Sequence, residues 1–575
     1  MSRRPSARAG VGLVAAGLLA ALASSVVGCG AGLRRFPARE VVWTDPDTRP
    51  FEGPPEGFYS SYSWDGADNA VFRPLAEFWT FETSREAWNV NAMDEVPSSS
   101  WYQNRLSVRT WTPARVARGA CDDLDDELPG PWRIVGGKPD GANPGFQIVD
   151  GEGVRYLMKT DGDLQAERPS AADVVGALVW HAAGFNVPCN RVVVFDRAVL
   201  ELDPDATIER TDGSEEPLTE ADVDAVLEKA TRLPDGRYRA SVSQFIDGRP
   251  ISPWRYHGRR DGDPNDVVPH EHRRDLRGQY VLSAWLDHID ARQENTMAAW
   301  VDVDGDAGEL GYVRHYMIDF GDTLGIIHSW DPLVRRFGHS GYLDVGHILT
   351  DFFTLGMLDR PWHHAEHGLA GETLGYFDVQ RFVPDRWRPG YANNAYDRMT
   401  ERDAAWMTRI IARFRDPLVR AVVERARFTD PQVTRELERI LVGRRDRILE
   451  RWLTRLSPLT WPEIRRVGGR RAVCLQDLAV WTGIRERRFR VYATRAFVGD
   501  DYRPVEAARA IEAEDAYVCV PIPAVDEDYL VLDVFAATPE RRRPFPARLH
   551  LRRGADGELA LVGLGRPDTH DPPSP

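Results

Sequence analysis

Lysine is the scarcest charged residue in this chain of 575 residues. Only Lys138, Lys159 and Lys229 are lysine among the 73 lysine and arginine residues, and 88 acidic residues bring the formal charge to −15. A protein that binds nucleic acid needs a basic face to neutralise phosphates, and this composition has no excess positive charge to form one. We therefore expect no nucleic-acid partner, unless the fold hides a local basic patch. We also expect the positions of the three lysines to be informative.

The chain has one long uncharged apolar run, at its N-terminus. Arg3, Arg4 and Arg8 precede the stretch 11–27, which is rich in alanine, leucine and glycine. This order is typical of a secretory signal, and the run is too short and too rich in small residues for a membrane span. No other stretch reaches about 20 apolar residues, so we expect the rest of the chain to form a body outside the bilayer.

The signal ends at Val26, Val27, Gly28 and Cys29. These residues resemble the lipobox of bacterial lipoproteins, in which cleavage precedes the cysteine and its thiol and new amino group are acylated. The resemblance implies lipidation of Cys29, export, and anchoring to the cell envelope, with the outer membrane as the expected site. Several acyl chains on one residue anchor a protein stably, so the membrane is an expected partner through the lipid. An ordinary cleaved signal with an incidental cysteine is the alternative.

Cysteine is scarce as well. Apart from Cys29 the chain has Cys121, Cys189, Cys474 and Cys519. An even number of cysteines in an oxidising compartment indicates disulfides, and four cysteines allow three pairings. We favour Cys474 with Cys519, because both lie in one C-terminal region. Buried free thiols are the alternative.

The length and composition indicate several folded units. The length corresponds to three or four of them, no clear repeats are present, and a content of 42% apolar and 28% charged residues excludes a disordered chain. Shifts in composition predict a signal peptide with its lipobox (1–29), a tether (30–55), an aromatic-rich extension packed on the next unit (56–130), a strand-rich part (131–248), a helical part (249–457), a small β-sandwich-like domain (458–566) and a tail (567–575).

Apolar periodicity predicts an α+β protein. A helix is expected at 171–183 among the first strands, with Ser170 as its N-cap and Gly184 at its end. Strands are expected at 132–135, 146–149, 154–159, 191–195 and 239–245, a surface helix at 219–230, further helices at 273–286, 344–355, 401–414, 416–426 and 430–456, and C-terminal strands at 489–492, 517–520, 529–534, 548–551 and 559–562.

A polar constellation follows the first of the downstream helices. His288, Asp290 and Asn295 are spaced as His-x-Asp-x4-Asn, and after a hairpin-like pair of strands Asp319 opens an Asp-Phe-Gly triplet. The first motif resembles the catalytic loop of the protein-kinase-like superfamily, and the second resembles its metal-binding triplet. Both occur in the order that the superfamily has.

This resemblance covers 132–456 and implies a two-lobed protein-kinase-like fold, with a β-rich N-lobe and a helical C-lobe. It also implies ATP or another nucleotide, with Mg²⁺, as cofactors. Phosphoryl transfer depends on positioning and charge neutralisation more than on covalent chemistry. Asp290 would orient or deprotonate an attacking hydroxyl, Asn295 and Asp319 would hold Mg²⁺, and His288 would brace the loop.

Lys159 ends the third expected strand, where the superfamily places the lysine that contacts the α- and β-phosphates. Lysine is a rare occupant of any cationic position in this chain, so its presence there supports the resemblance. Arginine would not replace it freely, because a compact ammonium and a planar guanidinium bind phosphate differently. The ion-pair partner would come from the next helix, where Asp173 is the best-placed acid and Glu167 the second.

A glycine-rich stretch joins the first two expected strands. Gly137, Gly141 and Gly145 belong to it. Backbone N–H groups in such a loop can surround phosphates, so these three glycines are candidate nucleotide contacts. An ordinary hairpin is the alternative.

The last strand of the expected N-lobe ends at Gln244, Phe245 and Ile246. The resemblance places there a hinge that holds adenine by backbone hydrogen bonds. The helical part is most similar to the divergent HipA-like and CotH-like members of the superfamily. Through stretches such as 94–105 and 270–274, the whole chain also resembles a group of bacterial lipoproteins that has no activity to transfer.

Two functions are compatible with these features. The first is a membrane-anchored lipoprotein that transfers a phosphoryl or nucleotidyl group from Mg-ATP to an unknown protein or small-molecule acceptor. The second is a catalytically inactive, pseudokinase-like scaffold in the cell envelope that binds protein or glycan partners. Acceptor choice is determined by loops that carry no motif in this chain.

Overall fold

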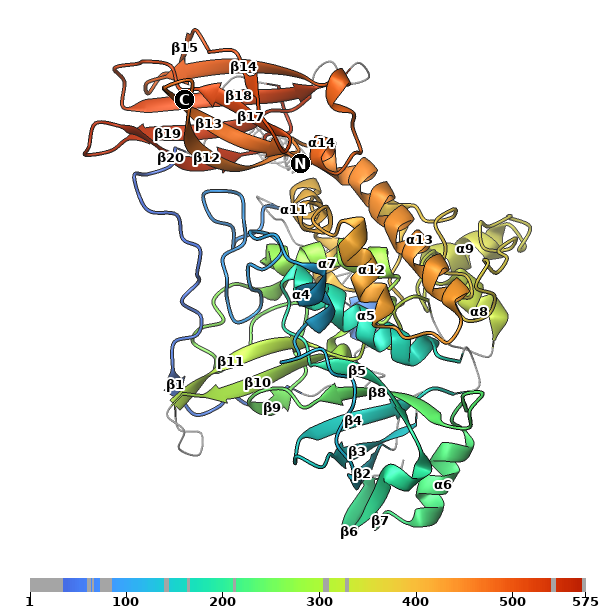
Figure 1. Cartoon of the computed structure of the whole chain (residues 1–575). Coiled ribbons are helices and arrows are strands. Elements are labelled where there is room, and N and C mark those ends of the chain that lie inside the picture. The colour runs from blue at the N-terminus through green and yellow to red at the C-terminus, as the bar shows by residue number, and fades with distance from the viewer. Residues whose placement is uncertain are drawn as a thin grey trace, which may run out of the picture.

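The computed structural model describes residues 35–58, 64, 67–72, 85–138, 144–162, 166–209, 214–303, 310–325, 330–538 and 544–570. Helices and sheets are mixed along the chain, which confirms the α+β class. Figure 1 shows one sheet at the bottom of the molecule, helices in the middle and two further sheets at the top. The expected signal peptide, the lipidation candidate Cys29 and the loop residue Gly141 lie outside the described residues.

The sheet at the bottom of Figure 1 has seven strands: β2 (Trp132–Lys138), β3 (Gly145–Val149), β4 (Arg155–Thr160), β5 (Asn190–Phe195), β6 (Leu200–Glu209), β7 (Glu215–Pro217) and β8 (Tyr238–Gln244). Their order is β5-β8-β4-β3-β2-β6-β7, and only the pairing of β2 with β6 is parallel. Ile134, Phe146, Met158 and Val242 are fully buried in its apolar core. The five strands expected in this part are all present.

Helix α5 (Arg168–Ala183) packs on β5 and β8 and is buried almost along its whole length. It begins two residues before Ser170, so the prediction that Ser170 is the N-cap is wrong. Pro169 suits the first turn, where no N–H bond is lost. The Ser170 hydroxyl instead donates to Asp161 at 2.6 Å. Gly184 ends the helix as predicted, with a φ of 126°.

The helical part is organised around α7 (Arg274–Leu286), in which every residue is buried. Among the described residues, no helix is both long and apolar enough to cross a membrane. The remaining helices are α4 (Pro113–Arg118), α6 (Glu220–Glu228), α8 (Asp331–Arg336), α9 (Val345–Phe353), α10 (Asn394–Asp397), α11 (Glu401–Ile411), α12 (Asp416–Glu424), α13 (Pro431–Ile448) and α14 (Leu478–Trp481), with π-helical turns η1 (Asp68–Phe72) and η6 (Leu449–Leu453) and 3-10 turns η2 (Arg197–Val199), η3 (His270–His272), η4 (Gln293–Asn295), η5 (Pro384–Arg386) and η7 (Arg487–Phe489).

A four-stranded antiparallel sheet separates the two sequence motifs. It consists of β1 (Phe51–Glu52), β11 (Leu310–Met317), β10 (Thr296–Asp302) and β9 (Arg249–Ser252), in that order. The hairpin β10–β11 is the predicted pair of strands. Because β10 begins directly after Asn295 and β11 ends two residues before Asp319, the hairpin brings the two motifs back to the same place.

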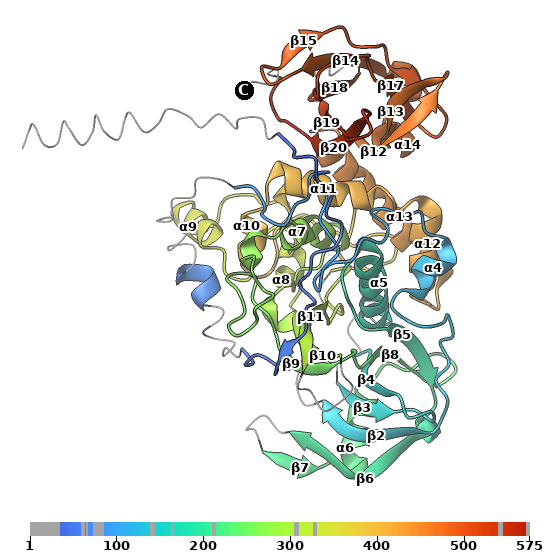
Figure 2. The same ribbon diagram turned by 90° about the vertical axis from the view of Figure 1, so that its left-hand side faces the viewer.

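The aromatic-rich extension packs against the helices. Trp101, Tyr102, Trp111 and Val116 belong to the same apolar cluster as the buried residues of α5 and α7. Figure 2 shows the corresponding blue ribbon running along the helical part. The extension is therefore part of the main core.

Two sheets form the C-terminal part. One has the order β12-β13-β17-β16 and the other β15-β14-β18-β19-β20, and both contribute to one apolar core. Figure 2 shows the two sheets facing each other. Their strands are β12 (Leu459–Val467), β13 (Arg470–Asp477), β14 (Val491–Val498), β15 (Arg503–Val505), β16 (Ile511–Glu512), β17 (Tyr517–Pro521), β18 (Tyr529–Ala537), β19 (Ala547–Arg553) and β20 (Leu559–Gly565).

Two disulfides are present. Cys474 and Cys519 face each other across β13 and β17 and are bonded, which confirms the favoured pairing. Cys121 in the extension is bonded to Cys189, directly before β5. The alternative of four buried free thiols is wrong.

Candidate functional site

Three segments that are far apart in the sequence meet near the C-terminal ends of β4 and β11. The Lys159 Nζ lies 2.7 Å from Asp319 Oδ1. The Ile318 N–H donates to the carbonyl of Asn295 at 3.0 Å, which joins the two loops. The Nδ2 of Asn295 donates to Asp290 Oδ2 at 2.7 Å. The structure thus brings together the predicted phosphate lysine, the predicted base and both predicted metal ligands.

Lys159 is a buried cation, with 7% of its surface exposed. Burial by itself would lower the pKa of its ammonium group, but the nearby carboxylates of Asp319 and Asp173 raise that pKa above its usual value. The ammonium group is therefore charged at neutral pH. A buried positive charge of this kind suits an anionic ligand.

The ion pair of Lys159 differs from the predicted one. Its partner is Asp319, and the predicted pair with Asp173 on α5 is not formed. Asp173 accepts a hydrogen bond from the Ser241 hydroxyl at 2.9 Å and another from the Phe320 N–H at 3.0 Å. Glu167, the second candidate, accepts a backbone N–H just before α13. Asp173 therefore holds the backbone of the Asp-Phe-Gly triplet and acts on Lys159 only through its charge.

Asp290 is a carboxyl group that can exchange a proton near neutral pH. Burial raises its pKa to about 7, although Arg292, with its Nε 2.9 Å from Asp290 Oδ1, acts in the opposite direction. The negative charges of Asp322 and Asp319 add to the increase. A pKa close to the operating pH is the value at which a general base is most effective.

Asp322 is a fourth acidic group that the motifs did not indicate. Burial raises its pKa, Arg168 lowers it, and the charge of Asp319 raises it further. The Asp-Phe-Gly triplet that resembles the superfamily motif ends at Gly321, so the motif does not include the next residue, Asp322. The only available signal was its position directly after the triplet.

His288 braces the loop by packing. Its ring is fully buried and lies 5.8 Å from the rings of both Trp180 and Phe320. Neither ring nitrogen has a hydrogen-bond partner in the part of the chain that the structure describes. Burial lowers its pKa to about 4, so the ring is neutral at physiological pH.

Phe320 fixes the backbone of the triplet against α5. A Cβ added at Gly176 would lie only 2.5 Å from the Cβ of Phe320, so the glycine allows Phe320 to approach α5 closely. Asp319 has a φ of 56°, a left-handed conformation that non-glycine residues adopt at a cost. The contact with Gly176 and the hydrogen bond from Phe320 to Asp173 maintain that conformation.

The glycine-rich stretch is largely a strand hairpin. Gly137 belongs to β2 and pairs with Phe146, and Gly145 belongs to β3 and pairs with Lys159. A Cβ at Gly145 would lie 1.9 Å from the carbonyl oxygen of Met158, so strand packing alone requires this glycine. Gly137 and Gly145 therefore lie in the two strands that flank residues 139–143, which are outside the described residues, and their contact with phosphate stays a prediction.

The expected hinge uses its donors within the sheet. The Gln244 N–H donates to the carbonyl of Cys189 at 2.9 Å, and the Phe245 N–H donates to that of Arg155 at 3.0 Å. Neither N–H can then donate to an adenine ring. Ile246 follows the end of β8 and is half-buried. These two N–H groups are therefore unavailable for the predicted hinge contact with adenine.

The oxygen donors of the site fit Mg²⁺. Within the described residues, no three histidine, cysteine or acidic side chains lie close enough to hold a metal ion alone. Mg²⁺ usually takes one or two carboxylates and completes its shell with waters and substrate phosphates. Because Asn295 uses its Nδ2 as a donor to Asp290, its side-chain oxygen is the atom that would bind a cation, and Asp319 is the other candidate ligand.

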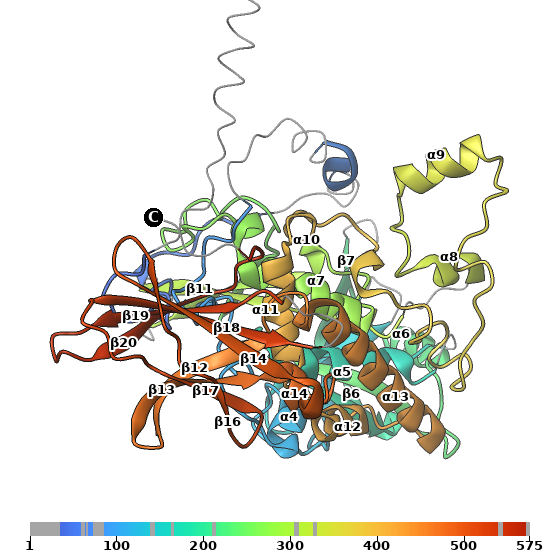
Figure 3. The same cartoon turned by 90° about the horizontal axis from the view of Figure 1, so that it is seen from above.

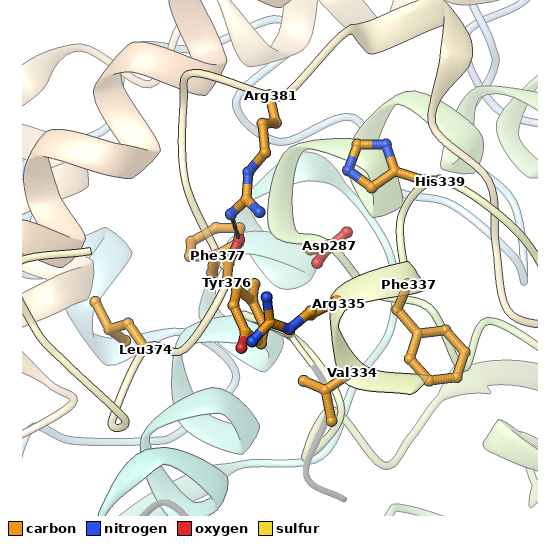
Figure 4. A pocket seen from close by; sticks show the side chains of 10 residues that line it. Asp287, Val334, Arg335, Phe337, His339, Leu374, Tyr376, Phe377 and Arg381 are labelled. Carbon is orange, nitrogen blue, oxygen red and sulfur yellow. Dashed lines mark hydrogen bonds between the residues drawn. The ribbon is translucent and has the colours of Figure 1, made fainter. Parts of the chain in front are cut away.

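A cavity lies beside the loop that carries His288 and Asp290. Figure 4 shows Asp287 surrounded by Arg335, His339 and Arg381. An adjoining cavity of about 250 Å³ shares Asp287, His339 and Arg381. Of the predicted site residues that the structure describes, none lines either cavity, and nothing in the sequence indicated the cavities.

Comparisons with known proteins place few constraints on this chain. No family model and no curated protein matches it. Two solved structures of a Golgi casein kinase align with it at TM-scores of 0.27 and identities of 10% and 11%. The alignments cover 56% and 69% of this chain and 74% and 92% of those chains, and the first of those structures contains Mn and ADP. At this TM-score the likeness carries no argument, so the function has to be inferred from the site itself.

Proposed function

We propose that this chain is a phosphotransferase of the protein-kinase-like type, in which Lys159, Asp290, Asn295 and Asp319 bind a nucleotide with Mg²⁺. The observation that carries the proposal is their convergence. Lys159 and Asp319 are 160 positions apart and form an ion pair, and Asp290 and Asn295 are hydrogen-bonded beside them. Phosphoryl transfer needs this combination of a phosphate cation, metal ligands and a base for the acceptor hydroxyl.

Each residue has a distinct task. The oxygen of the acceptor hydroxyl bonds to phosphorus, and the bond from phosphorus to the leaving oxygen breaks. Asp290 accepts the proton that the acceptor hydroxyl loses. Lys159 neutralises phosphate oxygens, and Arg292 orients the carboxylate of Asp290. Asn295 and Asp319 would hold Mg²⁺, which supplies charge neutralisation on the phosphates when bound.

The proposal extends to the whole chain. The seven-stranded sheet with α5 would form an N-lobe, and the part built on α7 a C-lobe, with the C-terminal sheets as a separate domain. The lipobox-like residues ending at Cys29 support export and lipid anchoring at the bacterial outer membrane. Nucleotidyl transfer would use the same residues, and the acceptor is an unknown protein or small molecule.

The test measures nucleotide binding and turnover on a chain that starts at Gly30 and so keeps every described residue. ATP is titrated with Mg²⁺ and with Mn²⁺ by calorimetry, and ADP release is measured. We expect Lys159→Ala and Asp319→Ala to abolish binding. We expect Asp290→Asn to bind ATP and to lower turnover about 100-fold or more, because a general base contributes roughly that much.

Lys229→Ala is the matched control, because Lys229 is an exposed lysine at the end of α6. It should bind and turn over ATP like the unchanged chain. ATP binding that survives both Lys159→Ala and Asp319→Ala would refute the site assignment. Binding to the unchanged chain without any turnover would favour the inactive scaffold.

A further inference from the structure

Helix α9 exposes an apolar stripe to solvent. Val345, Ile348, Leu349, Phe352 and Phe353 follow the i, i+3, i+4, i+7, i+8 spacing of one helix face, and they are 50–78% exposed. An amphipathic helix on a protein surface normally turns this face to the core. No residue of α9 is buried.

The polar face of α9 is the one that contacts the protein. His347 Nδ1 lies 2.9 Å from Ser340 Oγ, and its ring lies 5.4 Å from that of Trp362. Asp351 forms an ion pair with Arg360 at 2.6 Å. These contacts hold the helix so that its apolar stripe faces outward.

The apolar surface extends beyond the helix. Leu343 before it and Leu355 and Met357 after it are 56%, 83% and 79% exposed. The stripe itself contains no charged residue. A continuous exposed apolar surface of this kind marks a contact with another apolar phase or partner.

A second apolar projection lies on the same side of the molecule. Trp64, Val71 and Phe72, in and beside η1, are 58%, 42% and 52% exposed, and the rings of Trp64 and Phe72 are 5.6 Å apart. In Figure 2, α9 and the short blue helix η1 form the left edge of the described molecule. In Figure 3 the same two elements lie along the upper edge. One flat surface can therefore contact both.

We propose that α9, together with η1, inserts into the interface of the lipid bilayer to which the chain is anchored. The described structure begins at Arg35, six residues after the lipidation candidate Cys29. Six residues span at most about 20 Å, so the anchor keeps a bilayer within reach of the folded body. Phenylalanine and leucine on one helix face, as in α9, are typical of a helix that lies in the interface plane.

This proposal rests on the lipobox interpretation and is independent of the proposed phosphoryl transfer. It gives the body a defined orientation at the membrane. The acyl chains on Cys29 and the apolar face of α9 would then act as two signals, which together hold a protein more firmly than one.

The test uses the chain from Gly30, which lacks the lipid and keeps every described residue. Its flotation with vesicles of phosphatidylethanolamine and phosphatidylglycerol is compared with that of the double variant Phe352→Ser, Phe353→Ser. We expect the chain to bind and the double variant to partition at least about tenfold less, because two large apolar side chains no longer leave water. Equal thermal unfolding midpoints would show that the variant is folded.

The matched control is the double variant Phe489→Ser, Val491→Ser, which changes two residues of similar type that are 47% and 65% exposed on the C-terminal part. It should bind vesicles like the unchanged chain. A second readout places a fluorophore at Phe353→Cys, because the chain's other four cysteines are in disulfides. We expect the emission of this fluorophore to shift to shorter wavelength on vesicles.

Three results would overturn the proposal. The first is no vesicle binding by the unchanged chain. The second is binding that about 0.5 M NaCl abolishes, because screening at that ionic strength removes electrostatic contacts and spares apolar ones. The third is self-association without vesicles that the double variant Phe352→Ser, Phe353→Ser loses, since a second copy would then cover the stripe.

Discussion

Lys159 and Asp319 lie 160 positions apart in the chain and 2.7 Å apart in space. The residue types were visible in the sequence, because lysine is rare here and because Asp319 opens a recognisable triplet. Their contact was not visible, since it depends on how β4 and β11 are placed. The predicted partner Asp173 is instead used by Phe320 and Ser241, which no local pattern indicates.

Replacing Lys159 by arginine tests whether the site needs a compact ammonium. We expect Lys159→Arg to weaken ATP binding about tenfold or more, because a planar guanidinium replaces a small group in a buried position beside Asp319. Lys229→Arg, on the surface, is the control and should bind normally. Calorimetric titration measures both, and unchanged affinity for Lys159→Arg would show that the site requires only a positive charge.

Among the secondary-structure elements, those with strong alternation or helical spacing were predictable. All five expected strands of the seven-stranded sheet are present, but β6 and β7 were missed, because each contains a proline and acidic residues that obscure an apolar alternation. The start of α5 was also misplaced. Ser170 is bound to Asp161 and Arg239, so tertiary contacts outweighed its preference for capping.

Helix α5 positions the Asp-Phe-Gly triplet through its single glycine. We expect Gly176→Ala to displace Phe320, because the added Cβ would lie 2.5 Å from the Cβ of Phe320. Overpacking of this kind costs about 1–3 kcal/mol, more than the helix propensity of alanine returns. Thermal unfolding should show a lower midpoint, and ATP titration should show weaker Mg²⁺-dependent binding.

Gly346→Ala on α9 is the control for this substitution. The nearest atom to its added Cβ is 3.4 Å away, so alanine fits there. The midpoint should stay the same or rise slightly. If Gly176→Ala is as stable as the unchanged chain and binds ATP equally well, the close contact with Phe320 does not position the triplet.

Across the whole molecule, one carboxylate joins three parts of the chain. Asp94 in the extension accepts hydrogen bonds from Arg274 on α7 and Arg566 after β20, and it lies 3.5 Å from Arg409 on α11. Burial by itself would raise the pKa of Asp94, but these three arginines hold it below its usual value. The group therefore stays ionised and links the extension, the helices and the C-terminal sheets.

Removing this charge should destabilise the protein. We expect Asp94→Asn to lower the free energy of unfolding by about 3 kcal/mol, because it leaves three largely buried arginines without their shared counter-charge. Asp235→Asn is the control, since the ion pair of Asp235 with Arg237 is exposed and should matter little. Denaturant unfolding measures the unfolding free energy of both variants. Equal losses would mean that the buried carboxylate of Asp94 stabilises the protein no more than an exposed ion pair does.

Buried neutral histidines should make stability depend on pH. Burial lowers the pKa of His288 to about 4 and that of His550 to about 3, while unfolded histidines titrate near 6.5. Below about pH 6.5 the unfolded chain therefore binds more protons at these positions than the folded chain does. Their contribution to stability is complete above that pH and is lost as the pH falls.

The variant His550→Gln removes the contribution of one histidine to the pH dependence of stability. A single-residue variant is needed because the raised pKa values of Asp47 and Asp290 make the folded chain more stable on acidification, opposite to the histidines. Between pH 6 and 4 we expect the variant's unfolding free energy to change less steeply on acidification than that of the unchanged chain. The difference should approach about 1.4 kcal/mol per pH unit. Denaturant unfolding at several pH values measures it, and identical slopes would contradict a neutral buried His550.

The sequence by itself determined the chemical groups of the site, the order of the two motifs, the favoured cysteine pair and most of the helices and strands. These features depend on local composition and spacing, which the chain carries directly. The tertiary structure decided that Lys159 pairs with Asp319, that Asp322 joins the acidic cluster, that Gly145 serves strand packing and that the apolar stripe of α9 faces outward. Each of these depends on distances between segments that are remote in the chain, and such distances arise only when the segments pack together.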